Sequence, residues 1–89
     1  MNKIEEGMMK AVAGRYEWRS GNTQVVPDET GGVAIYLHGN HIATVLQNGN
    51  VLLNVQTVQR WPTATTVSRL RALDIPARRN NLDTVTVVL

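Results

Sequence analysis

Two histidines, His38 and His41, flank a Gly39-Asn40 pair and have the spacing best suited to share a metal ion. A two-residue turn at Gly39-Asn40 would place the imidazoles opposite each other on adjacent strands. A structural zinc site needs four ligands and a catalytic one at least three, whereas the neighbouring sequence adds only amides and a tyrosine. We therefore expect no metal site and interpret both histidines as polar surface.

Catalytic arrangements are absent from the sequence. The two serines stand without a nearby histidine and acid that could activate them. Carboxylates occur as adjacent pairs, Glu5-Glu6 and Asp28-Glu29, and adjacent residues do not share a helix face. Gly31-Gly32 lacks the Gly-Lys-Ser/Thr of a phosphate-binding loop. We expect neither enzyme activity nor a bound cofactor.

A threonine-rich segment, Thr63-Ala64-Thr65-Thr66, precedes Arg69 and has two interpretations. The first turn of a helix exposes unpaired N–H groups, which could bind a phosphate or carboxylate with help from hydroxyls and Arg69. Alternatively, Thr63 or Thr65 caps the helix and Arg69 reaches an acidic group nearby. We favour capping, because it uses a hydroxyl without requiring a ligand.

Basic residues concentrate in the last third of the chain. The net charge is only +2, but residues 1–59 carry −1 and residues 60–89 carry +3. All the basic residues of this last third are arginines, which suit bidentate contact with phosphate or carboxylate. With the mixed sheet face described below, they give a predicted partner-binding set: Tyr36, His38, His41, Arg60, Trp61, Arg69, Arg71, Arg78 and Arg79.

Two turn signals, Gly39-Asn40 and Asn48-Gly49, predict a three-stranded meander with two-residue loops. This register sets Leu37 opposite Ile42, and Leu46 opposite Val51. One face then carries eight aliphatic residues and one threonine: Val33, Ile35, Leu37, Ile42, Thr44, Leu46, Val51, Leu53 and Val55. The other face is mixed: Ala34, Tyr36, His38, His41, Ala43, Val45, Gln47, Asn50, Leu52, Asn54 and Gln56.

The flanking segments complete an α+β fold. Residues 1–13 are either flexible or a helix with Asn2 as N-cap, and residues 15–26 predict a hairpin. A short helix should end near Leu73, followed by a polar connector over 77–81 and a final strand over 84–89.

We predict a single domain, residues 1–89, in which 14–89 form the sheet and its helix. The sheet is an antiparallel meander of five or six strands, and one short helix packs on one face, between the last two strands. One short helix leaves much of the sheet uncovered. Either the sheet curls into a small barrel or another chain, such as a second copy in a homodimer, covers the remainder.

Two motifs carry a resemblance. The stretch from Tyr36 to Ala43 contains LHGN-x-IA, and a W-x-T-x-T-T-x-x-R-L helix start begins at Trp61. Both resemble a family of small uncharacterised bacteriophage and prophage proteins, as does the Tyr16-Glu17-Trp18 hairpin. The resemblance implies a phage origin.

Two functions remain open. The first is a small phage-encoded protein that modulates or inhibits a host protein or complex by stoichiometric contact, in host takeover or anti-defence, for example in the manner of an anti-CRISPR. The alternative is a nucleic-acid-binding accessory protein that uses the arginine-rich last third. The sequence has no cysteine and no apolar run long enough to span a membrane, so we expect no membrane association and a location in the host bacterial cytoplasm. We favour the protein-binding function, because the overall charge is modest.

Overall fold

The computed structural model describes residues 2–75, 77–79 and 85–87, and it confirms an α+β fold built on an antiparallel sheet. The sheet has five strands in sequence order: β1 (Trp18–Ser20), β2 (Thr23–Pro27), β3 (Val33–Leu37), β4 (Asn40–Val45) and β5 (Val51–Leu53). Strands β1 and β5 form its two edges, so the sheet is open rather than closed into a barrel.

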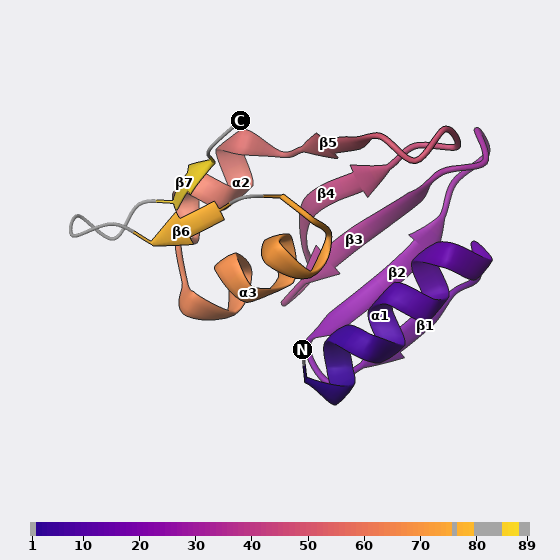
Figure 1. Cartoon of the computed structure of the whole chain (residues 1–89), viewed down its shortest axis with the longest axis horizontal. Helices are drawn as coiled ribbons and strands as arrows, with labels where there is room; N and C mark the ends of the chain where they lie inside the picture. Colours follow the sequence, from indigo (N-terminus) through magenta and orange to yellow (C-terminus); the bar gives the residue numbers. More distant parts are fainter. Residues whose placement is uncertain (1, 76, 80–84, 88–89) are drawn as a thin grey trace.

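The first residues of the chain form helix α1 (Lys3–Gly14), which is the helical alternative of the prediction. The Asn2 side chain accepts a hydrogen bond from the Glu5 N–H at 2.8 Å, and the Glu5 side chain accepts one from the Asn2 backbone. This capping box satisfies two N–H groups that would otherwise lack a partner. Figure 1 shows α1 lying along β1 and β2, against which it buries Met8 and Val12.

Two helices follow β5 where the sequence predicted one. Helix α3 (Ala64–Ala72) begins after the N-cap Thr63, as predicted. Helix α2 (Val55–Arg60) was missed, because residues 51–56 alternate like a strand. Asn54 interrupts the strand: its side chain accepts a hydrogen bond from the Thr57 N–H at 3.3 Å and caps α2.

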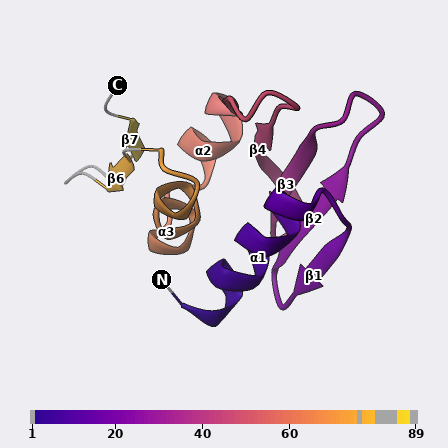
Figure 2. The same cartoon turned by 45° about the vertical axis from the view of Figure 1, so that its right-hand side comes forward.

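The helices gather on one face of the sheet and form a single core with it (Figure 2). Helix α1 contributes three buried apolar residues, α2 contributes Val58, and α3 contributes Val67 and Leu70. Met8, Ile35, Ile42 and Leu70 are the largest of the fully buried apolar side chains. The opposite face of the sheet carries no helix of the described residues, and we call it the open face.

The last two strands do not extend the main sheet. Strand β6 (Ala77–Arg79) pairs antiparallel with β7 (Val85–Val87) as a separate two-stranded sheet, and α3 lies between this pair and α1 in both views. Two predictions were therefore wrong: the polar connector over 77–81, and the placement of the last strand in the main sheet. Pairing with the strand next in sequence closes a shorter loop than pairing with a distant edge. The predicted positions 80–81, 84 and 88–89 lie outside the described residues.

The predicted register of the β3–β4 hairpin was wrong by two residues next to the turn and by one residue beyond a bulge. His38 and Gly39, with φ of 52° and 77°, form the turn, and Leu37 pairs with Asn40. A bulge then inserts Ile42 as an extra residue, so Ile35 pairs with Ala43 rather than with Thr44. The left-handed backbone at His38 is supported by a 2.8 Å hydrogen bond from its N–H to the Asn22 carbonyl.

The hairpin between β4 and β5 also differs from the prediction. Val45, not Leu46, pairs with Val51, and the connection runs through residues 46–50 with Gly49 at φ 91°. After the bulge, Ala43 and Val45 point into the core, whereas Thr44 is only partly buried. The predicted inner positions of β3 and of Val51 and Leu53 are confirmed, but the sorting of β4 beyond Ile42 was reversed.

Candidate functional site

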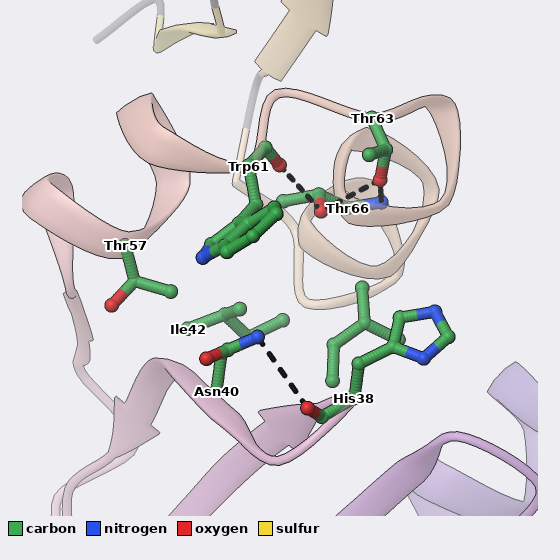
Figure 3. A pocket seen from close by; sticks show the side chains of 8 residues that line it. His38, Asn40, Ile42, Thr57, Trp61, Thr63 and Thr66 are labelled. Carbon is green, nitrogen blue, oxygen red and sulfur yellow. Dashed lines mark hydrogen bonds between the residues drawn. The ribbon is translucent and has the colours of Figure 1, made fainter.

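A pocket of 290 Å³ lies between the β3–β4 turn and the connection from α2 to α3 (Figure 3). The hairpin supplies one wall, with Leu37, His38, Asn40 and Ile42. The helices and their connection supply the other, with Thr57, Trp61, Thr63 and Thr66. We call this the Trp61 pocket. All of these residues except Thr57 fall within the two sequence motifs described above, which meet in space although about twenty residues separate them.

Hydrogen bonds hold Trp61 at the mouth of this pocket. The Thr66 hydroxyl, which is buried, donates to the Trp61 carbonyl at 2.9 Å and lies 3.0 Å from the Thr63 hydroxyl. Thr63 in turn accepts from the Thr66 N–H at 3.1 Å as the N-cap of α3. The threonine-rich segment therefore caps its own helix, as favoured from the sequence, and also fixes the tryptophan backbone.

The Trp61 side chain is 47% exposed, and the Arg60 guanidinium carbon lies 5.8 Å from its ring centroid. This distance is within the range of a cation–π interaction. Arg60 is exposed, and the eight residues that line the pocket include no carboxylate. The mouth of the Trp61 pocket therefore combines an accessible aromatic ring with an accessible positive charge.

Exposed apolar side chains concentrate around α2. Leu52, Val55 and Trp61 are three of the four large hydrophobic residues that are exposed in the described part of the chain; Tyr16 is the fourth. They fall within residues 52–61, on β5, at the start of α2 and just after it. We call these three residues the α2 patch. Leu52 pairs with Thr44 and points to the open face, whereas Trp61 lines the pocket on the helix side. Exposed large apolar side chains are candidates for contact with a partner.

The open face carries a second group of polar side chains. His41 pairs across the strands with Tyr36, and their ring centroids lie 5.5 Å apart. The His41 ring nitrogens lie 2.7 Å from the Thr44 hydroxyl and 3.2 Å from the Asn54 amide nitrogen. These bonds tie β4 to the residue that caps α2, so His41 has a structural use.

The two histidines do not come together as predicted. His38 lies in the turn with its ring 3.1 Å from the Asn22 amide nitrogen, whereas His41 faces Tyr36. Within residues 2–75 and the short described segments beyond, no group of three His, Asp or Glu side chains could hold a metal ion. Nor is any helix of the described residues long and apolar enough to cross a membrane.

Arg69 is used inside the fold. Its side chain is 5% exposed, its Nη1 donates to the Glu5 carboxylate at 2.8 Å, and its Nε donates to the Thr23 hydroxyl at 3.0 Å. The Ser68 hydroxyl donates to the same Glu5 oxygen. This network joins α1, β2 and α3, and it corresponds to the alternative in which Arg69 reaches an acidic group. Of the other predicted arginines, Arg71 is exposed. Arg78 and Arg79 lie in β6, and their side chains are outside the described part of the structure.

The network also sets the ionisation of Glu5. Burial alone would raise the pKa of its carboxyl group. Hydrogen bonds from Ser68, Arg69 and the Asn2 backbone, together with the Arg69 charge, outweigh burial and lower the pKa below its ordinary value. Glu5 is therefore held as a carboxylate that neutralises the buried guanidinium.

Sequence reasoning missed three residues of these sites. Asn40 and Thr57 line the Trp61 pocket, but Asn40 belongs to a predicted turn and Thr57 to no predicted element, so nothing indicated that they would meet. Glu5 was considered only as one of two adjacent carboxylates, although a glutamate three residues after an asparagine N-cap is a capping-box signal.

Comparison with known proteins gives one family. A family model described as "Kyanoviridae Gp96 protein" matches residues 1–85 of the chain. No curated protein and no solved structure matches it.

Proposed function

The chain belongs to the Kyanoviridae Gp96 protein family, a family of small phage proteins, and from this premise we propose that it is a binding protein that modulates or inhibits a host protein. It would act by stoichiometric contact in the host bacterial cytoplasm, during host takeover or against a host defence, in the manner of an anti-CRISPR. It would work without catalysis, cofactor or metal.

The α2 patch is the observation that carries this proposal. The exposed apolar side chains of Leu52, Val55 and Trp61 are unfavourably hydrated in a free monomer, and contact with a protein partner would remove such surface from water. Tryptophan is among the residues that most often dominate binding energy at protein interfaces. Trp61 adjoins Arg60 and lines the pocket with polar side chains, and specific interfaces combine apolar and polar groups in this way.

Quantitative capture from a lysate of the host tests the proposal. We expect the wild-type chain to retain one host protein or complex at a fixed molar ratio, and Leu52→Lys/Val55→Lys to retain at least tenfold less. Both residues are exposed, so the variant should fold normally. Tyr16→Lys is the matched control, since it changes the exposed apolar residue outside the patch and should retain the partner. Equal capture by both variants would reject the α2 patch as the binding surface.

The nucleic-acid alternative has a separate test. With Arg69 inside the fold, fewer arginines face solvent than the sequence suggested, so we expect weak binding to random DNA at physiological salt. The affinity of the protein for DNA should be measured against the logarithm of salt concentration. A slope equivalent to several released counterions would favour the alternative.

A further inference from the structure

The Trp61 pocket is large enough to hold an aromatic ring. Its volume is 290 Å³, and a cavity of about 150 Å³ is enough to hold a benzene molecule in another protein. Leu37 and Ile42, both buried, form its apolar interior, and the indole of Trp61 forms part of the opposite wall (Figure 3). A flat apolar ring can therefore contact the indole and displace water from the aliphatic side chains at once.

Free polar groups stand at the rim of the pocket. In the described part of the chain, no hydrogen bond involves the Asn40 side-chain oxygen or the Thr57 hydroxyl. The Asn40 amide nitrogen makes only a long bond of 3.4 Å to the His38 carbonyl. These groups can bond the backbone N–H and C=O groups that flank an inserted side chain.

We propose that the Trp61 pocket binds the ring of a phenylalanine or tyrosine of the host partner, and that Arg60 pairs with a carboxylate next to that residue. This inference rests on the proposed function, because it assumes that the partner is a protein. Charge complementarity supports the carboxylate, since Arg60 lies beside the mouth and the lining includes no acidic residue. Trp61 is exposed and also lines the pocket, so a polypeptide that contacts its ring can reach the pocket as well.

A nucleobase fits this pocket less well than a phenyl ring. A base carries hydrogen-bonding atoms around most of its edge, and the edge that entered first would lie against Leu37 and Ile42 without partners. A phenyl ring has no such atoms and a tyrosine ring carries only one hydroxyl, so fewer hydrogen bonds to water are lost when either ring enters.

Short peptides test the pocket without any host protein. We would titrate the ¹⁵N-labelled chain with acetyl-Asp-Tyr-amide and follow the indole N–H of Trp61 and the side-chain amide of Asn40 by NMR. Both signals should shift, while the indole N–H of Trp18 serves as an internal reference. Acetyl-Asp-Leu-amide should bind at least fivefold more weakly, and acetyl-Asn-Tyr-amide at least threefold more weakly. Equal binding of the tyrosine and leucine peptides would refute a ring pocket.

Variants assign the binding to named residues. Thr57→Met should fill the pocket and reduce tyrosine-peptide binding at least tenfold, whereas Gln59→Met, an exposed change on the same helix, should leave it unaltered. Arg60→Gln should abolish the difference between the Asp and Asn peptides. Thermal unfolding of each variant checks that the fold persists, and Trp61→Ala provides a second loss variant at an exposed position.

The outcomes separate the two proposals. Host capture without peptide binding would overturn the pocket assignment alone. Peptide binding without any captured host protein would overturn the proposed function alone. Larger shifts of the Trp61 and Asn40 signals with deoxyadenosine monophosphate than with the tyrosine peptide would overturn the choice of a side chain over a base.

Discussion

Gly7 lies inside α1, although glycine has a low helix propensity. A Cβ on Gly7 would lie 2.7 Å from Cζ2 of Trp18, which packs against the core. The residue weakens the helix locally but lets the indole lie directly on the helix backbone. The sequence indicated only the cost, because the contact joins α1 to β1.

We predict that Gly7→Ala destabilises the protein by about 1–2 kcal/mol, although alanine favours a helix by roughly 1 kcal/mol. The free energy of unfolding by urea measures this change. Gly14→Ala is the matched control: its Cβ would meet the ring of Tyr16, but that side chain is 46% exposed and can turn away. The control should be neutral or stabilising, and a stabilised Gly7→Ala would show that Trp18 also moves freely.

Arg69 gives a second prediction at this scale. Removing the guanidinium in Arg69→Met would leave the Glu5 carboxylate buried without its charge partner, and we expect a loss of about 3–5 kcal/mol of unfolding free energy. Arg71→Met, two residues along the same helix and exposed, should change stability by less than about 0.5 kcal/mol. If Arg69→Met and Arg71→Met lost similar amounts of unfolding free energy in urea, the buried Arg69–Glu5 pair would stabilise the fold no more than methionine at position 69 does.

At the scale of elements, Thr63 joins helix capping to the geometry of the Trp61 pocket. We predict that Thr63→Ala removes the N-cap of α3 and costs about 1 kcal/mol of stability. Thr63→Ser retains the hydroxyl and should cost little stability, because serine caps helices at least as well as threonine; thermal or urea unfolding measures both variants. Equal losses would indicate that the methyl group, not the hydroxyl, stabilises this helix start.

The elements also show where sequence patterns were sufficient. Helix α3 and the β1–β2 hairpin could be predicted, because their caps, turn residues and apolar spacing are all local. The β3–β4 register could not, since His38 adopts a left-handed backbone that histidine rarely takes and Ile42 is inserted as a bulge. Two successive buried residues, Ile42 and Ala43, mark that bulge only once burial is known.

The candidate site, too, could be predicted only where it depends on local sequence patterns. His38 and Trp61 were both predicted as contact residues, and the structure brings them to opposite walls of one pocket. Arg69 was placed in the same predicted set but is buried, because Glu5 and Thr23, its partners, are 64 and 46 residues away in sequence. Spacing along a chain carries little information about such distant pairs.

For the whole molecule, the lowered pKa of Glu5 predicts sensitivity to acid. The ionised carboxylate stabilises the folded state, so its contribution is present above the ordinary pKa of glutamate, 4.5, and is lost as the pH falls through the lower folded value. In urea unfolding at pH 7, 5, 4 and 3, Glu5→Gln should be less stable than wild type at pH 7, and the difference should shrink below about pH 4.5. Parallel stability curves would show that Glu5 does not govern this transition.

Self-association is a further proposal at this scale. The edge strands β1 and β5 have three residues each, which limits pairing with a second chain along either edge. A homodimer would therefore use the α2 patch or the open face. Sedimentation at high concentration should show dimers that Leu52→Lys reduces; monomers alone would exclude this proposal.

The pairing of the first helix with the last long helix has a consequence during synthesis. Arg69 is the 64th residue that the ribosome adds after Glu5, and reaching it takes about 3–13 seconds at roughly 5–20 residues per second. Until then the nascent chain can form its hairpins, but the Glu5 carboxylate has no guanidinium with which to pair when it is buried. A stop codon anywhere before position 69 would therefore release a fragment with an incomplete interior, which cellular proteases would degrade.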